Sequence, residues 1–243
     1  MNNKELEKLL DKYTRPENIS SLYKQDEVKN LRQTNTGENY HDIIAEYLLA
    51  RENFFEKNKY INQISRHSKG KIYNVKREPL EEKKKYFIHK EKRYEEWYAK
   101  FLFDSSFEPI GKIIHYQTPI NSTNSDGAGD VDLLAYDENN NRFSLIELKM
   151  IYNQEPILRA ILEICTYHAQ LADDELKKDF GYPDAHIQKI VLIFKDSPQY
   201  KQYKESEHIR KLAKKLDVTV LAFDTIITVV PCPSPNYFFK ENV

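Results

Sequence analysis

The clearest alternation of apolar and polar positions along the chain lies between residues 130 and 149. Two short apolar runs, at 131–135 and 143–148, flank the polar segment 137–141, which consists of turn-favouring residues. Runs of this length on either side of such a segment predict a β-hairpin.

Four charged residues, Asp130, Asp132, Glu147 and Lys149, interrupt these apolar strands. A charge inside an apolar strand is costly unless it is paired or holds a metal ion. Because side chains alternate between the faces of a strand, Glu147 and Lys149 point to one face, and Asp132 shares a face with Asp130. If the register sets Asp132 beside Glu147, two carboxylates and one ammonium converge, and such hard oxygen ligands suit Mg²⁺ or Mn²⁺. The simpler alternative is a surface hairpin with an ordinary Glu147–Lys149 ion pair.

The rest of the chain shows helical and strand patterns in alternation. Helices are expected over 6–13, 41–57, 79–103, 157–171 and 202–216, and strands over 111–117, 186–194 and 218–223. Parallel strands joined through helices form a sheet that is covered on both faces. The predicted fold class is therefore α/β with a mixed central sheet.

Composition narrows the class of protein without choosing an activity. A chain of 243 residues, 40% of them hydrophobic, can form one large packed domain or a core with an added arm. The formal net charge of −1 does not favour a general polyanion binder, although local patches matter more than totals. The two cysteines, Cys165 and Cys232, form no disulfide framework, and no apolar run approaches the ~20 residues of a membrane span. We therefore expect a soluble, cytoplasmic protein with reduced thiols.

The most basic part of the chain lies between residues 57 and 93, where tyrosines are interleaved with lysines and arginines. Basic side chains can follow a phosphate backbone, and aromatic rings can stack on unpaired bases. The candidate nucleic-acid-binding residues are Arg66, Lys69, Lys71, Lys83 and Lys84. A solvated helix face has a similar composition, so both interpretations stay open.

Asp132, followed by Glu147-Leu148-Lys149, resembles the active-site signature of the PD-(D/E)XK nuclease superfamily. The segments GDVDLLAY and LIELK look especially like the Holliday-junction-resolvase-like and restriction-endonuclease-like branches. One departure is that Gly129 and Asp130, not a proline, precede the aspartate. The resemblance implies a restriction-endonuclease-like αβββαβ core within residues 79–230, with an N-terminal helical arm at 1–78 and a Pro-rich tail at 231–243.

The resemblance also implies roles for the hairpin residues. Asp132, Glu147 and the main-chain carbonyl of Leu148 would hold Mg²⁺, and Mn²⁺ would be able to substitute for it. Lys149 would orient the attacking water and stabilise charge on the reacting phosphate. Asp130 would support these residues from the same strand.

The first helix of such a core often supplies a further glutamate near the metal. Glu96 is the better match to that position, and Glu95 is the rival. On the helix that follows the hairpin, Gln170 is a candidate supporting residue. The superfamily order of glutamine first and tyrosine second is not carried over, because here Tyr167 precedes Gln170.

The resulting expectation is a Mg²⁺-dependent nuclease that hydrolyses phosphodiester bonds, with DNA as the expected substrate and a homodimer as one form it could take. One alternative is a nuclease fold retained as a nucleic-acid-binding or assembly module that does not cut by itself. Another is a helical adaptor whose residues 1–78 bind a protein. A cleavage assay separates the first two, and a pull-down without nucleic acid tests the third.

Overall fold

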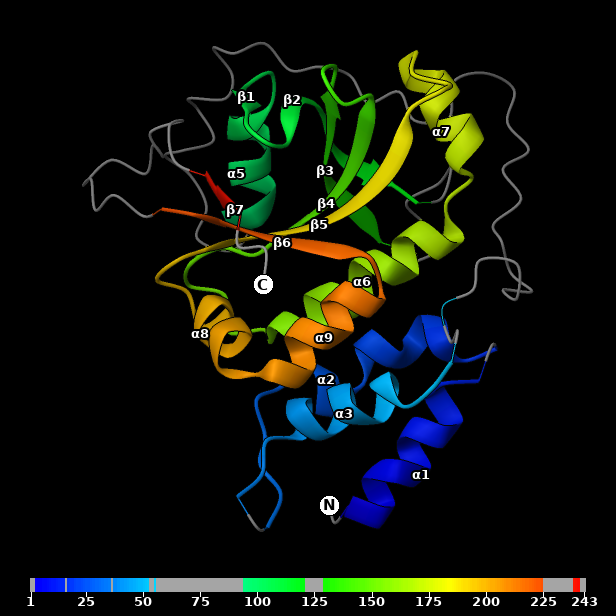
Figure 1. The fold of residues 1–243 in the computed structure, drawn as a ribbon, viewed down its shortest axis with the longest axis vertical. Coiled ribbons are helices and arrows are strands. Elements are labelled where there is room, and N and C mark those ends of the chain that lie inside the picture. Colours follow the sequence, from blue (N-terminus) through cyan, green and yellow to red (C-terminus); the bar gives the residue numbers. More distant parts are fainter. Residues whose placement is uncertain are drawn as a thin grey trace.

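The computed structural model describes residues 3–15, 17–35, 37–52, 55, 94–120, 129–224 and 238–240 of the chain. Its strands form one seven-stranded sheet with helices on both faces, which confirms the predicted α/β class (Figure 1). The strands are β1 (Ser106–Phe107), β2 (Gly111–Pro119), β3 (Asp130–Asp137), β4 (Arg142–Leu148), β5 (His186–Phe194), β6 (Val218–Phe223) and β7 (Phe238–Lys240). The helices are α1 (Asn3–Tyr13), the 3₁₀-helix η1 (Ile19–Lys24), α2 (Asp26–Lys29), α3 (Tyr40–Leu49), α5 (Tyr94–Leu102), α6 (Ile157–Gln170), α7 (Asp173–Phe180), α8 (Pro198–Glu205) and α9 (Glu207–Lys215).

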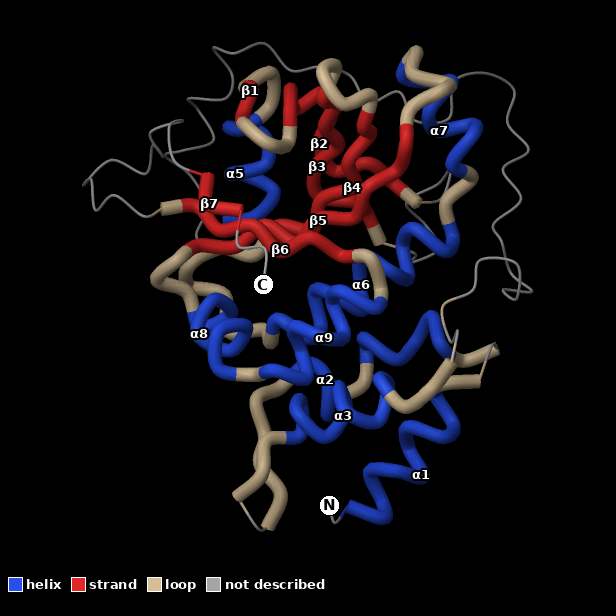
Figure 2. The backbone as a smooth tube through the Cα atoms, in the orientation of Figure 1, coloured by secondary structure: helices blue, strands red, loops and turns tan. Residues whose placement is uncertain are grey.

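The sheet is mixed, as predicted, and the strands follow one another in the order β1-β2-β3-β4-β5-β6-β7 (Figure 2). Pairing is antiparallel from β1 through β4, parallel from β4 through β6, and antiparallel again between β6 and β7. The predicted hairpin is formed by β3 and β4. The connections between the parallel strands run through helices, as parallel pairing requires.

Alternation along β4 directs its side chains into two different cores. Phe143 and Leu145 are buried in the core that contains α6, whereas Ile146 and Leu148 are buried in the core that contains α5. Helix α5 therefore covers one face of the sheet, and α6 and α9 cover the other (Figure 1). By the same alternation, the side chain of Glu147 is directed toward α6.

The N-terminal helices belong to the same core as α6: η1 and α2 pack onto α6, α3 packs onto α9, and α1 packs onto η1 and α3. Leu6 and Leu10 of α1 and Leu22 of η1 are fully buried in the cluster that also contains the apolar side chains of α6. The ring of Tyr23 meets that of Tyr167 edge to face, with centroids 5.9 Å apart. Residues of the expected arm thus contribute to the packed body. The predicted boundaries at 78/79 and 230/231 lie outside the described residues.

Several helix ends differ from the sequence expectation. The helix expected over 202–216 is two helices, because the side chain of Ser206 accepts the backbone N–H of Ile209 at 3.1 Å and so caps α9. The helix expected over 41–57 ends at Leu49, and of the one expected over 79–103 the structure describes only α5. The apolar pattern does not indicate α7, although left-handed Gly181 is typical of a helix end. Among the described residues, no helix combines the length and apolar character that a membrane crossing requires.

Candidate functional site

The predicted carboxylates meet where β3 and β4 separate. The pairing of these strands runs from Asp137↔Arg142 to Leu133↔Ile146, so the next step of the register would set Asp132 opposite Glu147. There the ladder ends, and the N–H of Leu148 donates to Oδ2 of Asp132 at 2.8 Å. Oδ1 of Asp132 accepts from Nε2 of Gln117 on β2 at 2.9 Å. The aspartate is thus fixed from both neighbouring strands.

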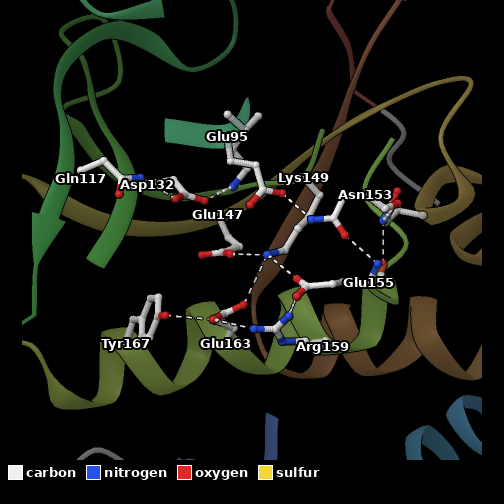
Figure 3. Close-up of polar contacts among 12 residues, drawn as sticks. Glu95, Gln117, Asp132, Glu147, Lys149, Asn153, Glu155, Arg159, Glu163 and Tyr167 are labelled. Atoms are coloured by element: carbon white, nitrogen blue, oxygen red, sulfur yellow. Dashed lines mark hydrogen bonds and ion pairs between the residues drawn. The ribbon is translucent and has the colours of Figure 1, made fainter. Parts of the chain in front are cut away.

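Lys149 lies at the centre of a group of carboxylates (Figure 3). Its Nζ is 2.7 Å from Oε1 of Glu147, 3.0 Å from Oε2 of Glu155 and 3.5 Å from Oε2 of Glu163. Glu147 and Lys149 are only 4% and 3% exposed. The two-residue period of a strand predicted that Glu147 and Lys149 share a face, and their ion pair confirms it. The alternative of an exposed surface pair is contradicted by their burial.

Helix α6 and the residue Glu155 just before it contribute a row of polar side chains to the site. Arg159 pairs with Glu155 and, at 3.6 Å, with Glu163, and the hydroxyl of Tyr167 donates to Oε1 of Glu163 at 2.9 Å (Figure 3). Positions 159, 163 and 167 are each four residues apart within α6, so they lie along one side of the helix, and Glu155 precedes its first turn. This spacing was the signal available in the sequence, beside the more conspicuous apolar stripe.

The hydroxyl of Tyr167 also lies against the start of β3. Gly129, immediately before Asp130, has φ +91°, and a Cβ added there would be 2.5 Å from that hydroxyl. A side chain at this position would therefore displace the tyrosine or the strand. The close approach accounts for a glycine at the entrance to the hairpin.

Removing the Tyr167 hydroxyl should weaken the fold measurably. Tyr167→Phe keeps the ring against Tyr23 but leaves Glu163 without one charge-assisted hydrogen bond, so we expect the free energy of unfolding to fall by about 1–3 kcal/mol. Urea denaturation measures the change. Tyr136→Phe is the matched control, because its hydroxyl donates to Asn141 at an exposed position, and it should change stability by less than ~0.5 kcal/mol. Equal effects of the two substitutions on the free energy of unfolding would contradict a stabilising role for the Tyr167–Glu163 hydrogen bond.

The site holds more negative than positive charge. Glu95, Asp132, Glu147, Glu155 and Glu163 contribute carboxyl groups, and Lys149 and Arg159 contribute the cations (Figure 3). Burial, together with the charges of Glu95 and Glu163, raises the pKa of Asp132 to about 7. Burial and the adjacent Asp132 raise the pKa of Glu147 well above its ordinary value.

The pKa shifts of Lys149 and Glu163 favour the charged form of each group. Burial works against the charge of Lys149, but Glu147 and Glu163 outweigh it and raise the pKa of the amine above its ordinary value. Burial likewise opposes the charge of Glu163, but Lys149, Arg159 and Tyr167 lower its pKa. Lys149 and Glu163 are therefore stabilised in their charged forms, whereas burial favours the neutral forms of Asp132 and Glu147.

The donor set fits a hard divalent cation by its chemistry. Two adjacent buried carboxyl groups whose pKa values are raised offer, once ionised, the oxygen ligands that Mg²⁺ and Mn²⁺ prefer, and Mg²⁺ commonly keeps several waters beside one or two carboxylates. In the part of the chain that the structure describes, no group of three or more His, Cys, Asp and Glu side chains is arranged to hold a metal ion. A cation here would thus depend on Asp132 and Glu147, with the Leu148 carbonyl and water completing its shell.

The structure separates the two glutamates of α5. Glu95 accepts from Nδ2 of Asn153 at 2.5 Å, and its charge acts on Asp132 and Lys149. Glu96, the preferred candidate from the sequence, forms an ion pair with Lys100 at 3.1 Å. Adjacent positions on a helix point about 100° apart, so the two side chains have different surroundings. Glu95 contacts the loop after Lys149 through Asn153, and Glu96 lies beside Lys100 with its charge acting on Asp130.

The remaining candidates lie at the margin or outside the described residues. Asp130 begins β3, and burial and the charge of Glu96 raise its pKa. Gln170 is the last residue of α6, beyond Tyr167, and within the described residues it makes no hydrogen bond to the cluster. The five basic candidates, Arg66, Lys69, Lys71, Lys83 and Lys84, lie outside the described residues.

No family model, curated protein or solved structure matches this chain. The interpretation of the site therefore depends on its own residues and geometry.

Proposed function

We propose that this protein is a metal-dependent nuclease that hydrolyses phosphodiester bonds, with a core of the PD-(D/E)XK type. The observation that carries the proposal is the burial of Asp132 and Glu147 side by side, with the amine of Lys149 2.7 Å from Glu147. An aspartate on one strand, and a glutamate and a lysine two residues apart on the next, is the arrangement expected from the sequence resemblance.

The order of elements supports the same proposal. Apart from β1 and α7, which intervene, helix α5, strands β2, β3 and β4, helix α6 and strand β5 occur in the αβββαβ order. The site lies at the end of β4, where the sheet changes from antiparallel to parallel pairing. Fold order alone does not establish an activity, so the activity is proposed from the side chains of the site.

In the proposed mechanism Asp132, Glu147 and the main-chain carbonyl of Leu148 hold Mg²⁺ or Mn²⁺. A bound ion of this kind supplies Lewis-acid polarisation of the phosphate and lowers the pKa of a water. Lys149, kept cationic by its three carboxylate neighbours, orients the water and stabilises the charge that develops on the phosphate. Glu163 and Glu155 hold the lysine amine in position.

The direct test is a cleavage assay of the purified full chain. We expect cleavage of plasmid, single-stranded DNA or RNA in Mg²⁺ or Mn²⁺ and none in EDTA, with DNA the expected substrate. Glu147→Gln, purified in parallel, should be inactive, which excludes a contaminating nuclease. Glu138→Gln removes an exposed acid from the turn of the same hairpin and should be fully active. Binding of nucleic acid without cleavage on any substrate would instead support a non-cutting binding or assembly module.

A further inference from the structure

The loop that follows Lys149 presents one aromatic side chain to solvent. Tyr152 is 79% exposed, and among the described residues the other exposed large hydrophobic is Leu31, at 51%. Met150 and Ile151, just before it, are partly buried against the core that contains α5. Tyr152 is therefore turned outward while its neighbours are turned inward.

Hydrogen bonds from neighbouring residues fix the loop that carries Tyr152. The N–H of Asn153 donates to the carbonyl of Met150 at 2.9 Å, which closes a turn with Tyr152 at its third position. The Asn153 side chain donates to Glu95 and accepts the N–H of Glu155 at 2.6 Å (Figure 3). Nε2 of Gln199 donates to the carbonyls of Asn153 and Glu155 at 2.8 and 2.6 Å. The ring is thus held out by a scaffold that is anchored to α5 and α8.

The loop keeps Tyr152 close to the proposed reaction centre. Three residues of chain span at most about 11 Å, and successive bases of a strand rise by about 3.4 Å. The bases next to a phosphate positioned at Lys149 would therefore lie at distances comparable with the separation of the Lys149 and Tyr152 backbones. An exposed aromatic on a fixed loop at this distance has the properties of a stacking platform, which accepts any base because every base has a π-face.

We propose that Tyr152 stacks on an unpaired base next to the scissile phosphate, so that the preferred substrate is single-stranded nucleic acid or the unpaired part of a duplex. The inference rests on the proposed nuclease function. A paired base presents only its edge to a ring approaching from the groove, whereas an unpaired base exposes its face. Tyr152 thus selects substrates without entering the chemical step.

Kinetics on matched substrates test the selection. Tyr152→Ala should raise KM for a single-stranded oligonucleotide by about tenfold or more, with kcat within about threefold, and should change KM for the blunt duplex of the same sequence much less. Tyr152→Phe keeps the π-face and should behave as wild type. Leu31→Ala is the control for loss of an exposed apolar side chain and should change neither constant. An unchanged KM for the single strand in Tyr152→Ala would overturn the proposal while leaving the nuclease function intact.

A fluorescence experiment gives a readout that is independent of cleavage. In EDTA, titration of Tyr152→Trp with oligothymidylate should quench the added indole, and titration with a blunt duplex should not. Leu31→Trp is the control for Trp97, the single native tryptophan, and for non-specific binding. Equal responses of the two variants would overturn the stacking role. Quenching confined to Tyr152→Trp would support base stacking by this residue even if the protein shows no cleavage activity. Failure of the nuclease proposal would therefore be distinguished from failure of the stacking proposal.

Discussion

Lys149→Ala should reduce metal-dependent cleavage by about 10²–10³-fold or more, because it removes the only cation within 3.5 Å of Glu147 among the described residues. It should also destabilise the protein in EDTA by about 3–5 kcal/mol, since Glu147 would remain buried without its partner. Cleavage assays and urea denaturation measure the two effects. Arg159 would still neutralise part of the charge on Glu155 and Glu163, so the loss of stability falls mainly on Glu147.

Two further lysine variants separate charge from position. Lys149→Arg keeps a cation among the carboxylates but replaces the compact ammonium by a larger, planar guanidinium group. The variant should therefore retain much of the wild-type stability while losing cleavage activity. Lys189→Ala removes a lysine on the neighbouring strand whose partner, Asp217, is 3.8 Å away and exposed, and it should change stability by less than about 1 kcal/mol. Full metal-dependent activity in a clean Lys149→Ala preparation would refute the role of the lysine.

The hairpin shows what a sequence pattern can predict about a site. A strand has a period of two, so the shared face of Glu147 and Lys149 follows from their spacing alone. The opposition of Asp132 and Glu147 depends on the register, which the polar turn at 138–141 fixes over a short distance. Both predictions concern neighbours in one local element, and the ion pair and the hydrogen bond from Leu148 are consistent with them.

The contributions from distant elements could not be predicted in the same way. Which of Glu95 and Glu96 faces the cluster depends on the rotation of α5 against the sheet, and two adjacent glutamates in the first turn of the helix do not specify that rotation. The four-residue spacing of Arg159, Glu163 and Tyr167 can be read from the sequence. That Glu163 contacts Lys149, however, depends on the packing of α6 against β4, which the spacing does not predict. Gln117 lies on β2, and its contact with Asp132 depends on the pairing of β2 with β3.

Stability and function should oppose one another at Asp132. In EDTA at pH 8, Asp132→Asn should raise the free energy of unfolding by about 1–4 kcal/mol, because burial makes the ionised carboxylate costly and each pKa unit corresponds to about 1.4 kcal/mol. The amide oxygen can still accept from the N–H of Leu148, and rotation of the Gln117 amide lets its oxygen accept from the new NH₂ group. The same variant should lose Mn²⁺ binding and cleavage, since an amide is a poorer ligand than a carboxylate.

The sign of the pH dependence distinguishes this effect from ordinary repacking. Between the ordinary pKa of 3.8 and the folded value of about 7, folded wild-type protein keeps a proton that the unfolded chain releases, so wild-type stability falls as pH rises. The variant lacks that group, and its advantage over wild type should grow from pH 4 to pH 7 and then level off.

Asp137→Asn is the matched control on the same strand. Burial opposes the charge of Asp137, but Asn140 and Arg142, the latter at 3.2 Å, hold its pKa below the ordinary value. Its replacement should therefore destabilise the protein and leave Mn²⁺ binding unchanged. Denaturation from pH 4 to pH 8 and calorimetric titration with Mn²⁺ provide the comparison. Two outcomes would contradict the proposed role of Asp132 as a metal ligand that destabilises the metal-free protein. One is an Asp132→Asn protein less stable than wild type at pH 8, and the other is Mn²⁺ binding equal to that of wild type.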